Sequence, residues 1–274
     1  MADRPVRRPV DRPADALLDE PADQRYVGGR DLTHWPSAAG RLAARGAHRL
    51  RGWLQPNQVL ALTLVIGFAL AAVLTALAGA VYDSVTEADG VARLDRPALD
   101  AVTGERTALG NHVAAGYALV GGSVGMSVLA TVTAVSLALL WRRWTPVVLV
   151  AATAAGSLAL TVIGKAVVGR TRPPLADAIP PFENTPSFPS GHALNSLAIA
   201  GIVAYLLVRE QRSARVRALT VSLAAAFAAT MGVSRVYLGA HWLSDVLVAW
   251  ALGLAWLTVV IVAHRLLLTV RRPG

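Results

Sequence analysis

The sequence predicts an all-α polytopic membrane protein in which six transmembrane helices form one bundle. Composition is the first reason: 54% of the 274 residues are apolar and only 16% are charged, too apolar for an ordinary soluble domain. Long apolar stretches are the second, because each is near the ~20 residues needed to cross a ~30 Å hydrocarbon core. The third is that arginines gather at alternate ends of these stretches, as the positive-inside rule describes.

Residues 1–56 are expected to form a cytoplasmic N-terminal tail. The first 30 or so are rich in Arg, Asp and Pro and lack a periodic apolar face, which predicts disorder rather than a signal peptide. Residues 37–54 change character, with arginines at helical spacing: Arg41, Arg45 and Arg49. This pattern predicts a basic amphipathic helix on the membrane surface, and a solvated helix is the alternative.

Six apolar stretches then define a membrane domain over 57–266, followed by a short cytoplasmic tail at 267–274. They lie at about 58–81, 113–140, 146–168, 192–208, 218–238 and 243–264. The second contains a GxxxG pattern at Gly121 and Gly125. Such a pattern indicates close packing within a bundle, with helix dimerisation as the less favoured alternative.

The arginine distribution predicts that both termini are cytoplasmic. Arginine-rich segments mark one set of ends: 41–51, 142–143, 209–217 and 265–272. The opposite side includes the 82–112 loop, which has six acidic residues against three arginines. The 169–191 loop and the 239–242 turn then lie on the outer face of the plasma membrane.

Overall charge and cysteine content exclude several classes of function. The net charge of +9 comes without aromatic–basic interleaving or zinc-ligand spacing, so no nucleic-acid partner is expected. The chain has no cysteine, which excludes disulfides and thiolate metal sites. The expected partners are the lipid bilayer and a membrane lipid substrate.

The stretch from Ser234 to Asp245 carries the strongest chemical pattern. His241 and Asp245 are four residues apart and would share one face of a helix, so the carboxylate could orient the imidazole as a nucleophile or base. Arg235 is suited to bidentate contact with a phosphate oxygen, and Gly239 allows the chain to turn between them. A chance His-x-x-x-Asp pair is the alternative for this stretch alone.

Two further clusters are expected on the same face. Lys165, the only lysine in the chain, precedes Arg172 by seven residues, which places both charges on one side of a helix end; a lysine that only reaches the interface is the alternative. Ser190 is a plausible N-cap for the next helix, whose free amides form an anion site. Gly191 permits close approach of a ligand, and His192 could donate a proton to a leaving oxygen.

Together the three clusters predict phosphoryl transfer without a metal or cofactor. They supply cations for the phosphate oxygens, a nucleophile, and an acid for the leaving group. Asp177 and Glu183 also lie in the 169–191 loop, but two acids among several cations are read as loop polarity rather than as a metal pair.

These motifs, taken in order, resemble the three-part signature of the type 2 phosphatidic acid phosphatase family, which is related to vanadium-dependent haloperoxidases. The residues that match are Lys165-x6-Arg172-Pro173, Pro189-Ser190-Gly191-His192 and Ser234-Arg235-x5-His241-x3-Asp245. The resemblance covers roughly 58–264 and implies a metal-independent membrane lipid phosphatase.

The resemblance also implies a role for each matching residue. His241 would form a phosphohistidine, Asp245 would hold and polarise it, and His192 would protonate the leaving group and then activate water. Phosphate contacts would come from the remaining motif residues: Lys165, Arg172, Ser190, Gly191 and Arg235.

Several functions remain open at this point. A polyprenyl diphosphate is the first substrate expected, followed by phosphatidate, phosphatidylglycerol phosphate and diacylglycerol pyrophosphate. A haloperoxidase that keeps vanadate in the same pocket is an alternative enzyme. A non-catalytic lipid-binding membrane protein is the alternative from another class, although both histidines of the signature are present.

Overall fold

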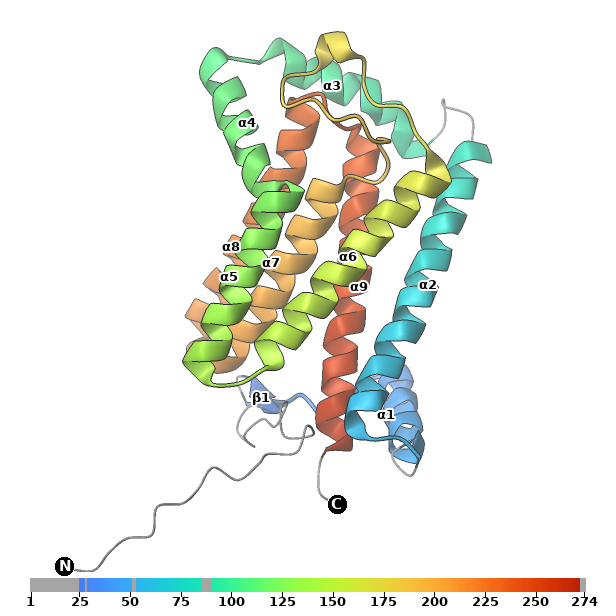
Figure 1. Ribbon diagram of the computed structural model, residues 1–274, viewed down its shortest axis with the longest axis vertical. Coiled ribbons are helices and arrows are strands. Elements are labelled where there is room, and N and C mark those ends of the chain that lie inside the picture. The colour runs from blue at the N-terminus through green and yellow to red at the C-terminus, as the bar shows by residue number, and fades with distance from the viewer. Residues whose placement is uncertain (1–24, 28, 51–52, 85–89, 272–274) are drawn as a thin grey trace, which may run out of the picture.

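The computed structural model describes residues 25–27, 29–50, 53–84 and 90–271. Its long helices run side by side along one axis, as Figure 1 shows. The helices are α1 (Ala38–Leu50), α2 (Pro56–Ser84), α3 (Asp95–Gly104), α4 (Ala108–Gly121), α5 (Ser123–Trp141), α6 (Thr145–Val168), α7 (Gly191–Glu210), α8 (Ala214–Tyr237) and α9 (Leu243–Val270). Within the described residues, six helices are long and apolar enough to cross a membrane: α2, α5, α6, α7, α8 and α9. The predicted six-span helical fold is confirmed.

The second predicted span, 113–140, is not one continuous helix. It is divided into α4 and α5 at Gly122, whose extended backbone (φ −68°, ψ 170°) ends one helix and begins the next. The GxxxG glycines therefore do not form one packing face. A side chain at Gly121 would overlap Met231 of α8, whereas one at Gly125 would overlap the last carbonyls of α4.

Two segments predicted to lack structure are partly ordered. The 82–112 loop contains a 3₁₀ turn, η3 (Gly90–Leu94), followed by α3, and α2 extends to Ser84. Of the tail predicted to be disordered, residues 1–24 lie outside the described residues. The strands β1 (Tyr26–Val27) and β2 (Arg30–Asp31) form a small antiparallel hairpin, so the prediction of disorder is wrong for this part. The predicted helix within 37–54 is present as α1.

Helix α7 lies in the middle of the bundle, between α6, α8 and α9. Small residues allow the helices to approach closely: a side chain at Gly156 of α6 would overlap the indole ring of Trp256 on α9. The Trp256 indole N–H donates to the carbonyl of Thr153, 3.1 Å away, so this buried polar group is satisfied. These contacts fix α6 and α9 relative to one another.

The bundle has two chemically different ends. At one end, η4 (Leu175–Asp177), α3 and the segment between α6 and α7 cover the helix termini (Figure 1). At the other end lie α1, the hairpin, the end of α9 and the arginine-bearing turns between α5 and α6 and between α7 and α8. The predicted motif residues all lie toward the first end.

Candidate active site

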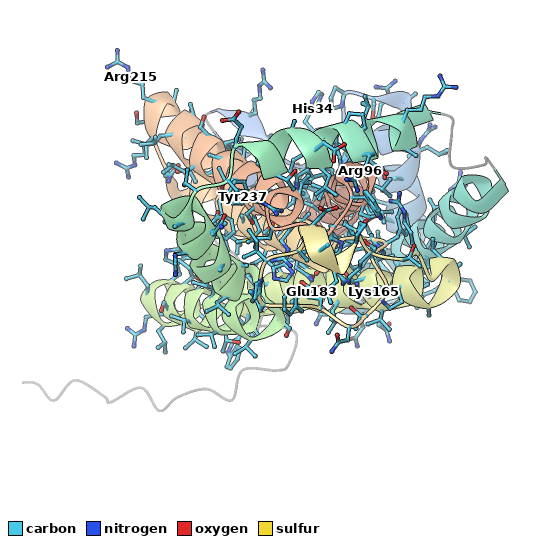
Figure 2. The ribbon with its side chains drawn as sticks, turned by 90° about the horizontal axis from the view of Figure 1, so that it is seen from above. His34, Arg96, Lys165, Glu183, Arg215 and Tyr237 are labelled. Atoms are coloured by element: carbon cyan, nitrogen blue, oxygen red, sulfur yellow. The ribbon has the colours of Figure 1, made fainter. Side chains whose placement is uncertain are left out.

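Four helix ends meet where the motif residues lie. The C-terminal ends of α6 and α8 and the N-terminal ends of α7 and α9 come together beneath the 169–190 segment. Figure 2 looks onto this end, with Lys165 and Glu183 labelled where the segment crosses the bundle. Each motif thus lies at a helix terminus, where backbone groups are free to bind ligands.

Glycines in the left-handed region make the two turns at this end. Gly169 (φ 61°) ends α6, and its N–H donates to the carbonyl of Lys165 at 3.1 Å. Gly239 (φ 66°) follows α8, and a side chain there would overlap the backbone of Asp177. The predicted turn at Gly239 is present. It allows the His241 N–H to donate back to the carbonyl of Arg235, 3.3 Å away.

The carboxylate of Glu183 lies at the centre of the motif residues. Arg235 Nη2 is 2.5 Å from its Oε1, and Arg172 Nη2 is 2.7 Å from its Oε2. His192 Nδ1 lies 3.5 Å from Oε1, and His241 Nε2 lies 3.7 Å from Oε2. The interpretation of Glu183 as loop polarity is therefore wrong. Its carboxylate occupies an anion site formed by two arginines and flanked by two histidines.

The electrostatics of this site favour an anion. Burial alone would raise the pKa of Glu183, but the neighbouring His241, Arg235 and Arg172 outweigh burial and hold that pKa well below its usual range. Glu183 therefore stays ionised at neutral pH, and its negative charge balances part of the arginine charge.

Several hydrogen-bonding groups remain unpaired around this anion. Among the described residues, Nε and Nη1 of Arg235 and Oγ of Ser190 are buried and have no hydrogen-bond partner. Both side chains are fully buried. Unpaired buried donors are costly, so a ligand with acceptor oxygens would be stabilised by hydrogen bonds to them. A phosphoryl group has more oxygens than a carboxylate and could accept from these donors.

The site is bordered in different ways by Arg172 and Lys165. Arg172 Nη1 lies 3.2 Å from His241 Nε2, so the guanidinium touches both the anion and the histidine. Lys165 donates to the carbonyl of Pro186, which also accepts from Arg172 Nη2 at 3.3 Å. Lys165 thus lies near Arg172 and borders the site through the loop, but the predicted helical spacing is not the reason, because α6 ends at Val168 before Arg172.

His241 does not lie on a helix with Asp245, contrary to the sequence interpretation. Helix α9 begins at Leu243 with Trp242 as its N-cap, and Asp245 Oδ2 accepts from the Trp242 N–H at 3.0 Å. His241 Nδ1 is 3.7 Å from Asp245 Oδ2, too long for a hydrogen bond. Ser187 Oγ lies between them, donating to Asp245 Oδ2 at 2.5 Å and standing 3.4 Å from His241 Nδ1.

His192 is oriented by the helix break that the sequence did not predict. Its Nε2 is 3.1 Å from the carbonyl of Ala118, one of the last carbonyls of α4. Because a carbonyl can only accept, Nε2 carries the proton. Nδ1 therefore faces the anion site and is free to exchange a proton with a ligand there.

The start of α7 supplies the backbone part of the anion site. Ser190 is the N-cap residue, as predicted, but its side chain makes no capping hydrogen bond and remains available to a ligand. Gly191 is the first helical residue, and a side chain there would press on Thr161 of α6. The first amides of α7 have no intrahelical acceptor, which suits them to bind phosphate oxygens.

Asp245 is held by an ion pair with Arg170, which also pairs with Asp95, and the sequence did not predict these contacts. Arg170 lies 2.5 Å from Asp245 and 2.7 Å from Asp95 of α3. Asp95 is 4% exposed and also accepts from the backbone N–H and the hydroxyl of Ser244, at 2.8 and 2.7 Å. These contacts fix α3 to the start of α9. The only available sequence signal was Arg170 itself, two residues before Arg172.

No cluster of three or more His, Asp or Glu side chains suited to a metal ion is found among the described residues. Asp177 and Glu183 are engaged by different arginines, since Asp177 pairs with Arg96 at 3.1 Å. Metal independence stays a prediction about the reaction.

Comparison with known proteins identifies the family. Residues 145–267, which contain every motif residue, match the PAP2 superfamily. The fold resembles the crystal structure of the first transmembrane PAP2 type phosphatidylglycerolphosphate phosphatase from Bacillus subtilis, with a TM-score of 0.59 and 26% identity over 73% of this chain and 92% of that one. The PAP2 superfamily match covers 123 of the 274 residues and lies in the motif-bearing part of the chain. The family predicted from the motifs is confirmed.

A named bacterial phosphatase is also similar in sequence to part of this chain. Phosphatidylglycerophosphatase B of Bacillus subtilis (strain 168) is 36% identical to this chain over 88 residues. That match covers 32% of this chain and 42% of the relative's length. The aligned part is therefore less than half of the relative and about a third of this chain.

Proposed function

We propose that this PAP2 protein is a membrane phosphatase that hydrolyses a lipid phosphate through a phosphohistidine on His241. The observation that carries the proposal is the anion site itself. Two arginines bind one carboxylate, and the two histidines approach that carboxylate through different ring nitrogens, Nε2 of His241 and Nδ1 of His192. A phosphoryl group in place of the carboxylate would meet a nucleophile and an acid.

In the first step, Nε2 of His241 attacks phosphorus and the bond from phosphorus to the ester oxygen breaks. Protonated His192 gives the proton on Nδ1 to the leaving oxygen, which departs as an alcohol. Arg172, Arg235 and the α7 amides stabilise charge on the phosphoryl oxygens. Asp245, acting with Ser187, stabilises the proton on His241 Nδ1 while Nε2 forms the new bond.

In the second step, water attacks the phosphohistidine. Neutral His192 accepts a proton from this water through Nδ1, and the bond between phosphorus and His241 Nε2 breaks. Inorganic phosphate forms, and both histidines return to their starting states. No metal takes part in this scheme because the arginines and helix-start amides provide the charge stabilisation.

Phosphatidylglycerol phosphate is the substrate we propose first. Its support is that both the sequence match and the structural match from Bacillus subtilis are named as phosphatases of this lipid. The motif-based expectation of a polyprenyl diphosphate becomes the second candidate. A haloperoxidase is less favoured because the chain is embedded in the membrane. A non-catalytic role is less favoured because it does not explain why two histidines lie beside the anion site.

The test is hydrolysis by the purified full-length protein in mixed micelles. We expect kcat/KM for phosphatidylglycerol phosphate to exceed those for phosphatidate and a polyprenyl diphosphate. A preference for the polyprenyl diphosphate would overturn the substrate assignment. Absence of phosphate release from every lipid would overturn the phosphatase proposal, and vanadate-dependent halide oxidation would favour the haloperoxidase.

We also propose that the site faces the outside of the plasma membrane, on the basis of the arginine distribution. Single cysteines at Asn184, beside the site, and at Ser213, at the opposite end, test this in a chain without native cysteine. Both positions are exposed. We expect an impermeant thiol reagent on intact cells to label only position 184. Labelling of position 213 alone would reverse the orientation.

A further inference from the structure

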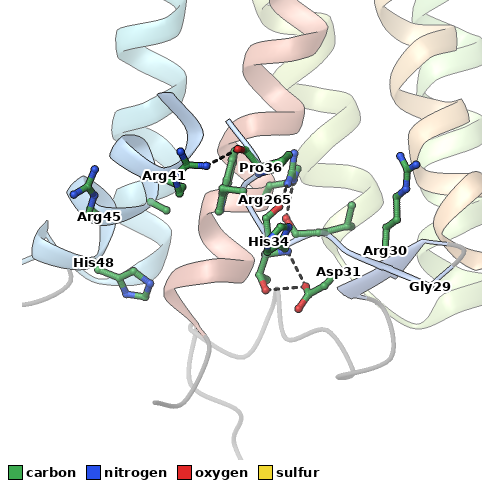
Figure 3. A pocket seen from close by; sticks show the side chains of 13 residues that line it. Gly29, Arg30, Asp31, His34, Pro36, Arg41, Arg45, His48 and Arg265 are labelled. Carbon is green, nitrogen blue, oxygen red and sulfur yellow. Dashed lines mark hydrogen bonds between the residues drawn. The ribbon is translucent and has the colours of Figure 1, made fainter. Parts of the chain in front are cut away.

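A large pocket lies at the end of the bundle opposite the candidate active site. It has a volume of about 1400 Å³ and is formed by α1, the 29–36 segment and the end of α9. Figure 3 shows its side chains, with Arg41, Arg45 and His48 projecting from α1 and Arg265 from α9. None of these residues belongs to the family signature, and the proposed phosphatase reaction does not use them. We call this space the α1 pocket.

The α1 pocket has a strong excess of positive charge. Four arginines line it, namely Arg30, Arg41, Arg45 and Arg265, against one carboxylate, Asp31. Asp31 accepts from the backbone N–H and the hydroxyl of Thr33, at 2.8 and 2.7 Å. In the described part of the chain, no acidic side chain forms an ion pair with Arg30, Arg41 or Arg45. An anionic ligand would complement this charge.

Two of these guanidiniums are held in place by neutral partners. Arg265 lies 4.2 Å from the centre of the Trp35 ring and donates to the carbonyls of Leu32 and His34, at 2.7 and 3.0 Å. Arg41 donates to the carbonyl of Pro36. Carbonyl acceptors are neutral and do not balance the positive charge of these arginines. The guanidiniums are therefore held in place and can still bind an anionic ligand.

The position of the pocket indicates a ligand at the membrane boundary. Arg265 is five residues before the end of α9, about 8 Å along the helix axis. The chain that enters the first span, α2, carries an exposed Trp53 (88%), and α1 carries an exposed Leu42 (66%). Apolar side chains beside a cationic pocket fit a lipid, whose tail stays in the bilayer, better than a soluble anion.

We propose that the α1 pocket binds the phosphate headgroup of an anionic phospholipid in the leaflet opposite the candidate active site. Arginine provides planar pairs of donors that match phosphate oxygens, which explains why guanidiniums rather than acids line the space. The bound lipid would anchor α1 and the 29–36 segment to the end of α9. The proposal is independent of the phosphatase reaction.

The test uses the full-length protein in nanodiscs that contain either phosphatidylcholine alone or phosphatidylcholine with phosphatidylglycerol. Binding of a fluorescent phosphatidylglycerol is measured for the wild type and for Arg41→Gln/Arg45→Gln. The matched control is Arg212→Gln/Arg215→Gln, which removes the same charge from exposed arginines at the same end. We expect the pocket variant to weaken lipid binding about tenfold and the control to change it less than about twofold.

Three results would overturn the proposal. Equal losses in both double variants would mean that binding follows overall charge and not the pocket. Displacement of the lipid by inorganic phosphate alone would assign the pocket to a soluble anion. Unchanged lipid binding in Arg45→Gln, whose exposed side chain makes no hydrogen bond to any described residue, would also count against it. Unfolding in phosphatidylcholine discs, expected to be the same for all variants, checks that each protein is folded.

Discussion

Replacement of Glu183 by Gln tests whether this carboxylate competes with the substrate. Its two oxygens bind Arg172 and Arg235 at 2.7 and 2.5 Å, so a phosphoryl group that binds these arginines must displace it. A hydrogen bond between charged groups contributes about 1.5–3 kcal/mol, and a neutral one about 1 kcal/mol. In Glu183→Gln the two hydrogen bonds to the arginines are weaker by about 2 kcal/mol in total. A phosphoryl ligand that displaces this side chain should therefore bind roughly thirtyfold more tightly.

The assay for Glu183→Gln is direct binding of vanadate or phosphate to the full-length protein, measured without turnover. We expect the dissociation constant for vanadate to fall about thirtyfold. Asp177→Asn is the matched control, because it removes the same charge from the same loop but pairs with Arg96 outside the site. An unchanged or higher dissociation constant in Glu183→Gln would refute the competition argument.

The pKa of Glu183 adds a pH signature to the same variant. Because the pKa of this carboxyl is lowered in the folded protein, its ion pairs stabilise the fold fully above the ordinary glutamate pKa, about 4.3. That contribution is lost only as the pH falls below this value toward the folded pKa. The ligand-free wild type should therefore be more stable than Glu183→Gln at pH 7, with a difference that shrinks below about pH 4.

Three further predictions concern the reaction and its support. Alanine at His192 should lower kcat strongly for a lipid substrate but less for nitrophenyl phosphate, whose leaving group needs no proton; equal losses would argue against His192 as the acid. Asn at Asp95 should cost about 3 kcal/mol of stability in chemical unfolding, because it removes the buried carboxylate from its ion pair with the half-buried Arg170; an unchanged stability would contradict that role. Turnover should persist in a chelator, and activity that disappears and returns with Mg²⁺ would refute the assigned mechanism.

The spans could be predicted from the sequence because each depends on local hydropathy. Helix α6 begins and ends close to the predicted stretch, and α9 begins where predicted but continues six residues past the predicted end at 264. A run of apolar residues is typical of both a helix and a membrane span. The break at Gly122 could not be predicted. The carbonyl of Ala118 beside this break contacts His192, and no local pattern relates two residues that are 74 positions apart.

The motif residues were found because their types and spacing reflect local chemistry, whereas their partners depend on long-range contacts. Asp95 and Arg170 are 75 residues apart, and no spacing rule relates them. Glu183 lies in a segment without periodicity, so its place between two arginines follows only from the packing of α6, α7 and α8. The helical relation of His241 and Asp245 was wrong because Asp245 caps the start of α9 instead.

Trapping of the phosphorylated enzyme tests the central proposal most directly. Rapid acid-free quenching during turnover of a radiolabelled substrate should give a base-stable, acid-labile phosphoprotein, since a phosphorus–nitrogen bond has this stability. Peptide mapping should place the phosphoryl group on Nε2 of His241, the nitrogen that faces the anion site. His192→Ala, which slows the attack of water on the intermediate, should increase the trapped fraction with nitrophenyl phosphate. A phosphoryl group on His192, or no phosphoprotein in either protein during turnover, would contradict the mechanism.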